Sequence, residues 1–203
     1  MRRRATTREI EIKLPVADLR DILRRLRRLA TPFRGRVFEQ NTLYDTPDSA
    51  FRRAGYLLRI RLETPAPGGG PKHGKARGVL TAKFPAPLAK RAERSRYKER
   101  SERELTIRDP RHWPGLLHSL GLRPSFRYEK YRTTFRLPSL YLDLDETPVG
   151  VFLELEGEPA AIDRAARALG FSSRDYFRGT YWDVYATDCR RRGRPVRNMV
   201  FSS

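Results

Sequence analysis

Near the start of the chain, charged residues stand at every second position. Glu9, Glu11 and Lys13 alternate with isoleucine or leucine. Because successive side chains of a β-strand point to opposite faces, both carboxylates and the ammonium group would share one face of a strand. Two carboxylates suit a hard divalent cation such as Mg²⁺, and a lysine beside them suits a phosphate that the cation would bridge. This spacing therefore indicates chemistry on a polyanion.

The same spacing recurs in five further segments, and within each of these pairs the two charges have the same sign. The pairs are Arg59 and Arg61, Glu102 and Glu104, Lys130 and Arg132, Asp143 and Asp145, and Glu154 and Glu156. A solvated strand face more often mixes signs or carries Ser, Thr and Gln. Like charges held side by side repel, so such pairs usually need a counter-charge, a metal or a charged ligand nearby. Because the charged spacing recurs in six segments, the alternative interpretation, that these are ordinary half-buried strands without a binding site, becomes weaker but stays open.

Seven segments, taken in order, resemble the CYTH family, also called triphosphate tunnel metalloenzymes. These segments are Glu9–Lys13, Leu43–Asp48, Gly55–Arg61, Leu80–Lys83, Glu102–Glu104, Glu129–Arg132 and Val151–Glu156. The resemblance covers nearly the whole chain, from about residue 7 to residue 185. The family includes class IV adenylate cyclases, thiamine triphosphatases and inorganic tripolyphosphatases. The resemblance implies an α+β fold, in which an eight-stranded antiparallel β-barrel with flanking helices encloses a triphosphate tunnel.

Secondary structure can be placed coarsely from periodicity. Apolar residues at helical spacing predict helices over 15–30, 111–120 and 160–169, with shorter helical segments around 173–186. Alternating segments predict strands near 7–14, 37–45, 55–63, 78–84, 98–107, 126–137, 139–146 and 150–157. The resemblance places the apolar strand faces outward against helices and the charged faces around a water-filled tunnel. Periodicity alone does not say which face lies inside.

Length and charge bound the organisation of the chain. A chain of 203 residues favours a single domain, which we place at residues 1–188, followed by a basic tail at 189–203 that we expect to be disordered. The net charge of +19 implies attraction to an anionic partner. No zinc-finger spacing, recognition-helix pattern or RNP-like aromatic run is present, so nucleic acid is expected to bind at most non-specifically through the basic surface.

The single cysteine and the length of the apolar runs bear on the cellular location of the protein. The single cysteine, Cys189, cannot form an intramolecular disulfide, which fits a reducing compartment. No apolar run has the length of a signal peptide or of a bilayer span. We therefore expect a cytoplasmic protein without a membrane partner.

Two loop segments suggest other sites. Gly69 to Lys75 nearly spell a phosphate-binding loop, but Ala76 offers no hydroxyl for magnesium, and the preceding segment is rich in proline, so we set this interpretation aside. The basic segment 85–96 is expected to lie over the tunnel mouth. The three histidines, at positions 73, 112 and 118, show no metal-ligand spacing.

The resemblance assigns roles to individual side chains. Basic residues would bind the triphosphate oxygens, where an arginine fork can bind two oxygens at once: Lys13, Arg59, Arg61, Lys83, Lys130 and Arg132. Carboxylates would hold Mg²⁺ or Mn²⁺: Glu9, Glu11, Glu154 and Glu156. Four further carboxylates would hold a second metal or orient the attacking water: Glu102, Glu104, Asp143 and Asp145. Lys13 is expected to act with them as a catalytic residue. Arg178 is the candidate to replace a C-terminal lysine that parts of the family carry.

The expected function is therefore a metal-dependent triphosphatase that acts on inorganic tripolyphosphate or a small organic triphosphate such as thiamine triphosphate. One alternative is a class IV adenylate cyclase, which would also need a purine pocket that the sequence does not reveal. A second is a non-enzymatic polyphosphate or nucleic-acid binder, against which the acidic pairs argue, because carboxylates repel polyanions unless a metal intervenes. A homodimer is left open. The basic tail is expected to be dispensable for hydrolysis.

Overall fold

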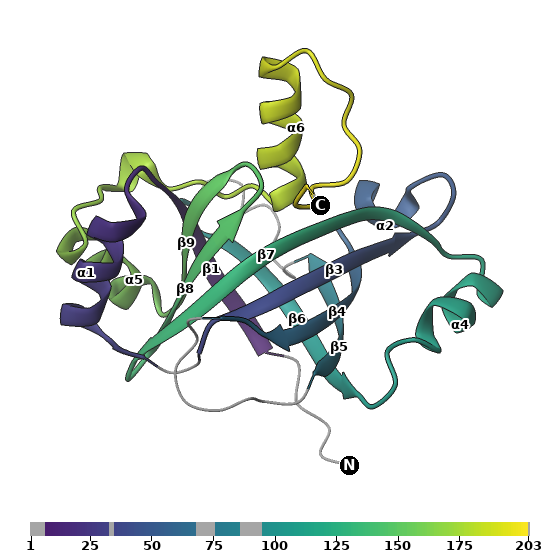
Figure 1. Cartoon of the computed structure of the whole chain (residues 1–203), viewed down its shortest axis with the longest axis horizontal. Helices are drawn as coiled ribbons and strands as arrows, with labels where there is room; N and C mark the ends of the chain where they lie inside the picture. The colour runs from purple at the N-terminus through teal and green to yellow at the C-terminus, as the bar shows by residue number, and fades with distance from the viewer. Residues whose placement is uncertain (1–6, 33–34, 68–75, 86–94, 203) are drawn as a thin grey trace.

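Eight antiparallel strands close into a barrel (Figure 1). The computed structural model describes residues 7–32, 35–67, 76–85 and 95–202. The barrel strands are β1 (Thr7–Val16), β3 (Val37–Asp45), β4 (Leu57–Pro65), β5 (Arg77–Pro85), β6 (Lys98–Ile107), β7 (Arg123–Leu137), β8 (Leu140–Thr147) and β9 (Gly150–Gly157). Their order around the barrel is β7-β3-β4-β5-β6-β1-β9-β8, and the pairing of β8 with β7 closes it. The expected α+β barrel fold is confirmed.

The outer face of one side of the barrel packs against two helices, α1 (Leu19–Leu29) and α5 (Pro159–Ala168). On β1, the apolar members of the alternating run, such as Ile12 and Leu14, are almost fully buried in this cluster. Helix α5 contributes Ile162, which is also fully buried. The apolar faces therefore point outward toward helices, as expected, and the charged faces are left for the interior.

The remaining elements lie around the two ends of the barrel. A second apolar cluster includes Leu117 of α4 (Trp113–Ser119), and α2 (Ala50–Arg53) follows the end of β3. The two-residue strand β2 (Thr31–Pro32) pairs with β7, and a single turn of 3-10 helix, η1, spans Ser173–Asp175. Helix α6 (Tyr181–Arg191) lies at the top of the view in Figure 1, and its first residue, Tyr181, belongs to a third apolar cluster together with Phe126 and Tyr128.

The helix predicted over 15–30 begins later than expected. Strand β1 continues to Val16, and Pro15 lies opposite Phe152 of β9. The helix starts only at Leu19, because the side chain of Asp18 accepts hydrogen bonds from the backbone N–H groups of residues 20 and 21, at 2.8 and 3.1 Å. Such a cap satisfies N–H groups that have no partner inside the helix, and it sets the first turn.

The expectation of a disordered basic tail is wrong for the part of it that the structure describes. Helix α6 runs through Arg191, and Asp188 accepts a hydrogen bond from that arginine at 2.8 Å. Farther on, Met199 is fully buried and pairs with β7. Its backbone N–H donates to the carbonyl of Arg127, and its carbonyl accepts from the N–H of Glu129, both at 2.9 Å. The segment after α6 therefore forms part of the packed domain.

Replacing Met199 with alanine is expected to lower the free energy of unfolding by about 2–5 kcal/mol, because the substitution leaves a cavity beneath the aromatic cluster at this end of the barrel. Denaturant titration of both proteins measures the change. The matched control is Val200→Ala, since this side chain is 43% exposed and should be nearly neutral. Equal stability of the Met199 variant and the parent would mean that the segment does not pack on β7 in solution.

Other sequence features fall partly outside the described residues. The segment resembling a phosphate loop, which includes His73, and residues 86–94 of the basic segment expected over the tunnel mouth lie there. No helix in the described ranges is both long enough and apolar enough to cross a membrane.

Candidate active site

A cavity of about 340 Å³ lies inside the barrel and is lined by the inward-pointing members of the alternating runs. Thirteen of the fifteen site residues predicted from the sequence line it: Glu9, Glu11, Lys13, Arg59, Arg61, Lys83, Glu102, Glu104, Lys130, Arg132, Asp143, Glu154 and Glu156. The structure thus brings together charged residues from β1, β4, β5, β6, β7, β8 and β9.

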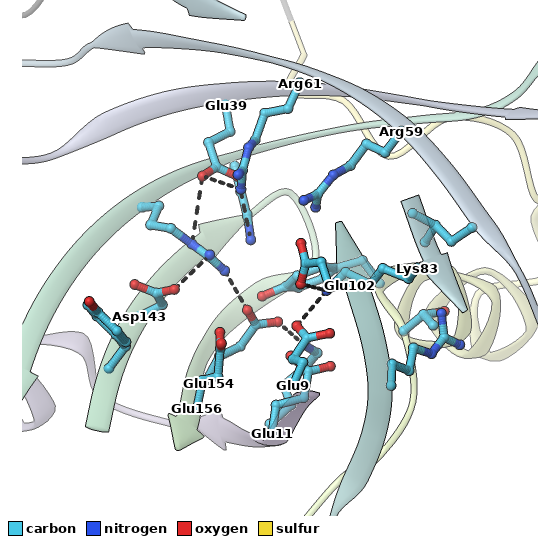
Figure 2. Close-up of a pocket in the computed structure, with 18 of the residues that line it drawn as sticks. Glu9, Glu11, Glu39, Arg59, Arg61, Lys83, Glu102, Asp143, Glu154 and Glu156 are labelled. Atoms are coloured by element: carbon cyan, nitrogen blue, oxygen red, sulfur yellow. Dashed lines mark hydrogen bonds and ion pairs between the residues drawn. The ribbon is translucent and has the colours of Figure 1, made fainter. Parts of the chain in front are cut away.

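Four glutamates gather on one side of this cavity and two arginines face them from the other, with counter-charges such as Lys13 and Glu39 among them. Figure 2 shows acidic side chains of β1 and β9 together in the lower half of the view: Glu9, Glu11, Glu154 and Glu156. Arg59 and Arg61 of β4 reach toward them from the opposite side. We call these two surfaces the acidic wall and the basic wall. An anion bound between them could contact guanidinium groups on one side and a carboxylate-bound cation on the other.

Strand register explains how like charges tolerate their neighbours on the acidic wall. Lys13 lies opposite Glu154 in the pairing of β1 with β9, and its ammonium group donates a hydrogen bond to that carboxylate. Glu11 lies opposite Lys98 of β6, with Nζ at 2.5 Å from Oε1. Burial raises the pKa of Glu11, but the nearby ammonium groups, chiefly that of Lys98, outweigh it and bring the pKa to about 2. The repulsion along one strand is therefore relieved only in part across strands, because Glu156 also lies opposite Glu11.

The basic wall is held by hydrogen bonds that its arginines donate to side chains of β3, β5, β6 and β7. Arg59 donates to the hydroxyl of Tyr128 at 3.0 Å and to Thr81 at 3.2 Å. Arg61 donates to Glu39 at 3.4 Å and to Glu104 at 3.2 Å. Burial lowers the pKa of Arg59, but Tyr128, Glu104 and Glu39 outweigh it, so the guanidinium remains charged. Both forks are consequently fixed before any ligand arrives.

Two carboxyl groups in the cavity lack sufficient positive charge around them. Burial raises the pKa of Glu102 to about 7, and the charges of Glu9 and Glu104 add to this effect although Lys83 opposes it. Burial likewise raises the pKa of Glu156 to about 8, with the charge of Glu9 as the next cause. The ammonium of Lys83 is shared, because it lies 2.5 Å from Glu9 and 3.2 Å from Glu102. Protonation of these two carboxyl groups is therefore favoured in this part of the cavity, and a bound cation would compete with the proton.

The acidic wall fits a hard divalent cation by its donor chemistry, since it offers carboxylate oxygens whose mutual repulsion a cation would relieve. Within the described residues, no three His, Cys, Asp or Glu side chains are arranged to hold a metal by themselves. Magnesium commonly binds through one or two carboxylates and completes its coordination with water and substrate phosphates. The wall suits that mode rather than a dedicated protein cage.

Two predicted site residues do not line the cavity. Asp145 is fully buried behind it, and it accepts hydrogen bonds from Lys130 at 2.8 Å, from Arg132 at 2.6 Å and from the hydroxyl of Tyr181 at 2.5 Å. Its prediction as a catalytic residue is corrected, because it positions these cations and does not face the cavity. Arg178 is exposed and donates to the carbonyl of Ser95 at 2.5 Å, so it does not replace a tunnel lysine.

Several lining residues were not predicted, and most of them extend a recognised alternation by one or two positions. Apart from Tyr181, they are Glu39, Leu57, Glu63, Lys98, Arg100, Tyr128, Thr134, Tyr141 and Thr180. Glu39 is the most central, because its carboxylate lies 3.4 Å from Arg61, 3.6 Å from Lys130 and 3.8 Å from Arg132. No alternating pattern pointed to Tyr181, because this residue lies on helix α6 and not on a strand. The centre of its ring lies 4.1 Å from Nζ of Lys13 and 4.7 Å from Nζ of Lys130, which places two cations against one aromatic ring.

Some polar atoms of the barrel interior have no hydrogen-bond partner within the described part of the chain. They are Nε of Arg59 and Arg61, Oε2 of Glu39 and both side-chain amide atoms of Asn41, although Nε of Arg61 lies 3.2 Å from Glu63 and Oε2 of Glu39 lies 3.6 Å from Lys130 as ion pairs. Buried polar groups in folded proteins are almost always bonded to protein or ordered water. The interior therefore keeps hydrogen-bonding capacity that water or a bound ligand can use.

A closed antiparallel barrel with facing acidic and basic walls defines this protein as a triphosphate tunnel protein by architecture. The chain belongs to the CYTH domain family, which matches residues 7–181. It is 24% identical over 162 residues to a "putative adenylate cyclase" of Methanocaldococcus jannaschii, covering 79% of this chain and 83% of that protein.

Solved structures share the fold. The PH1819 protein of Pyrococcus horikoshii superposes with a TM-score of 0.72 at 23% identity, over 89% of this chain and 99% of that one. HpAC1 of Hippeastrum, described as a "putative adenylyl cyclase" with a dominant triphosphatase activity, superposes with a TM-score of 0.56 at 18% identity, over 93% of this chain and 97% of that one. At these identities the likeness establishes the fold and leaves the reaction to be argued from the site.

Proposed function

We propose that this protein is a divalent-metal-dependent triphosphatase that hydrolyses a phosphoanhydride bond of a bound triphosphate. The observation that carries the proposal is the balance of charge in the cavity. Eight basic and nine acidic side chains line it, although the whole chain carries a net charge of +19. A non-enzymatic polyanion binder would need an excess of positive charge at its site. A nearly balanced tunnel suits a triphosphate that arrives with a divalent cation.

The basic wall would bind the phosphate oxygens. Arg59 and Arg61 present fixed guanidinium groups, and Arg132, held by Asp145 and Asp143, presents a third. Hydrolysis requires little covalent work from the protein, because positioning and charge stabilisation of the transferred phosphoryl group supply most of the catalysis. The fixed guanidinium groups would therefore act by orienting the phosphate chain in line with an attacking water.

The acidic wall would bind the metal through Glu9, Glu11, Glu154 and Glu156. When bound, Mg²⁺ or Mn²⁺ neutralises phosphate charge and holds the phosphate chain in one orientation. Glu102 is the candidate to orient the water and take its proton, because its pKa of about 7 suits a base near neutral pH. The neighbouring Glu104, whose pKa burial would raise but Arg61 and Arg59 lower to about 2, stays ionised and holds those arginines.

A class IV adenylate cyclase is the second candidate. Cyclisation of ATP needs a place for the base, and a more apolar cavity adjoins the tunnel at Arg100 and Tyr128. In that reaction the ribose 3′-hydroxyl attacks the α-phosphate and pyrophosphate leaves. In hydrolysis water attacks the terminal phosphorus, the diphosphate end of the substrate leaves, and the transferred phosphoryl group is released as orthophosphate. The two reactions are therefore separated by their products.

Incubation of the full chain with inorganic tripolyphosphate, ATP and thiamine triphosphate, each with Mg²⁺ or Mn²⁺, tests the proposal. We expect orthophosphate from at least one of these substrates, and complete loss of the activity when EDTA removes the metal. Orthophosphate, pyrophosphate and cyclic AMP are assayed separately. Pyrophosphate with cyclic AMP in equal amounts would establish the cyclase instead. The absence of all three products, together with tight and salt-sensitive DNA binding, would favour the binder.

A further inference from the structure

Exposed arginines gather on the two helices that cover the outer face of the barrel, α1 and α5. Because the tunnel lining is nearly balanced in charge, the net charge of +19 arises outside it. Four exposed arginines of α1 are spaced so that they share one face of the helix: Arg20, Arg24, Arg27 and Arg28. On α5, Arg164 and Arg167 are exposed and stand about one turn apart. We call these six side chains the arginine face.

The two helices of the arginine face are joined to each other. Arg25 of α1 donates a hydrogen bond to the carbonyl of Leu169, at the end of α5, at 3.1 Å. Gly170, with φ 86°, permits this approach, because a Cβ at this position would meet the guanidinium group of Arg25. Figure 1 shows α1 and α5 together on the same side of the barrel. Their outward faces therefore form one surface.

Most of the arginine face has no counter-charge. In the part of the chain that the structure describes, five of its six guanidinium groups form no ion pair and no hydrogen bond, and the exception is Arg24, which pairs with Asp21. The other acidic residue of the two helices, Asp163, is also occupied. It pairs with Arg96 at 2.5 Å and accepts a hydrogen bond from the hydroxyl of Tyr97 at 2.9 Å. The positive charge of the face is therefore not neutralised by these helices.

Helix stability alone does not account for this arrangement. Arg27 and Arg28 stand in the last turn of α1, where cations interact favourably with the helix dipole. Arg20 stands in the first turn, where the dipole disfavours a cation. In addition, Arg20 with Arg24 and Arg24 with Arg28 are like-charge pairs four residues apart, which weaken a helix. An anion bound along the face would relieve both effects.

The groups that the arginine face lacks narrow the class of its ligand. Neither helix contains an aromatic residue, whereas proteins that bind single-stranded nucleic acid stack the bases on aromatic side chains. Among the described residues, the well-exposed large apolar side chains lie on other elements, so the face offers no apolar group to a membrane interface. From Arg20 to Arg28 the helix extends about 12 Å, a length in which duplex DNA presents about seven phosphate charges.

We propose that the arginine face binds the backbone of double-stranded nucleic acid without reading its sequence. A guanidinium group can bind two phosphate oxygens at once, which suits a surface that contacts only the backbone. No residue of the face lines either cavity, so this binding is separate from the tunnel and does not depend on the proposed triphosphatase function. The arginine-rich C-terminal segment differs, because Arg191, Arg192 and Arg194 all pair with Asp188.

The salt dependence of duplex binding measures how many phosphates the face neutralises. With its five unpaired arginines engaged, a plot of log K against log salt should have a slope of about −4.5, which is a loss of roughly 500-fold between about 50 and 200 mM salt. In the triple variant Arg20→Gln, Arg27→Gln and Arg28→Gln, the slope should be about −1.8 and the loss roughly 12-fold. Fluorescence anisotropy of a labelled DNA duplex of about 20 base pairs, in EDTA, measures both proteins.

The matched control is a second triple variant, Arg8→Gln, Arg53→Gln and Arg111→Gln. It removes the same charge from exposed side chains on other parts of the surface, each of which pairs with a carboxylate. This protein should keep the parental slope. Both triple variants should keep the circular dichroism spectrum of the parent and its turnover of triphosphate, because none of these residues lines the tunnel.

Four results would overturn the inference. The first is the absence of duplex binding by the parent at about 50 mM salt, and the second is an equal slope in the two triple variants. The third is tighter binding of a single strand of the same sequence than of the duplex. The fourth is tighter binding of phosphatidylserine vesicles than of the duplex, lost in the α1 variant, which would assign the face to a membrane surface. Duplex binding with the expected slopes but no triphosphate turnover would support this inference and refute the triphosphatase function alone.

Discussion

Turnover of the Glu9→Gln variant is expected to fall at least about 100-fold, because the substitution removes a charged oxygen ligand from the acidic wall where the metal would bind. Glutamine keeps the shape of the side chain and can still accept a hydrogen bond from Lys83, which lies 2.5 Å from Glu9. We therefore expect the variant to fold. Steady-state orthophosphate release across a range of Mg²⁺ and Mn²⁺ concentrations measures the effect, and circular dichroism checks the fold.

The matched control is Glu99→Gln. Glu99 lies opposite Ile10 on the outward side of β6 and pairs with Arg8 at 2.7 Å, so its loss removes one carboxylate charge without touching the tunnel. Its turnover should stay within about twofold of the parent, as is usual for a surface pair of small energy. Near-normal turnover of the Glu9 variant at ordinary Mg²⁺ would remove this residue from the metal site.

Arg59→Ala should raise KM for the triphosphate and lower kcat, with a combined loss of about 100- to 1000-fold in kcat/KM. The reason is that this guanidinium is held in place by Tyr128 and Thr81 before the substrate binds. Arg59→Lys should recover only part of the loss, because lysine keeps the charge and loses the two-pronged hydrogen bonding. Kinetics of both variants with the preferred substrate give the comparison.

Arg127→Ala is the control for bulk charge, since this exposed residue of β7 lines neither cavity. It should retain parental kcat/KM. Full recovery in Arg59→Lys would show that only net positive charge matters at this position. An unaffected Arg59→Ala variant would place Arg59 outside the reacting complex and would count against the basic wall as a whole.

The barrel and most of its charged interior could be predicted from the sequence because they depend on a period of two. Alternation fixes which residues share a strand face, so one recognised pair such as Arg59 and Arg61 identifies a face. It cannot fix which residues lie opposite that face across the barrel. That information depends on register, and register is what gives Glu11 its partner Lys98. The central carboxylate, Glu39, was missed because the next inward residue on its strand is Asn41, which is uncharged.

The sequence also could not predict how deeply each charged side chain lies within the barrel. Asp143 and Asp145 have the same spacing as the other pairs, yet only Asp143 lines the cavity. Asp145 lies behind Lys130 and beneath the hydroxyl of Tyr181, a residue from a helix 36 positions later in the chain. Local composition also led to a wrong prediction at the C-terminus. The many arginines there suggested a disordered tail, while one buried methionine, Met199, attaches the segment to β7.

The position of β1 between β6 and β9 has a consequence for how the chain folds. The first strand of the protein pairs with the last one, and the contact between Lys13 and Glu154 spans 141 positions. Contacts so distant in sequence form slowly, because the loop they close loses much conformational entropy before any pairing is gained. During synthesis, β1 must wait as an unpaired strand until β6 and β9 have left the ribosome. Its alternating charges then keep it soluble, since charged side chains on an open strand edge discourage pairing with other chains. We therefore expect the carboxylates proposed to hold the metal also to discourage aggregation of the unfinished barrel.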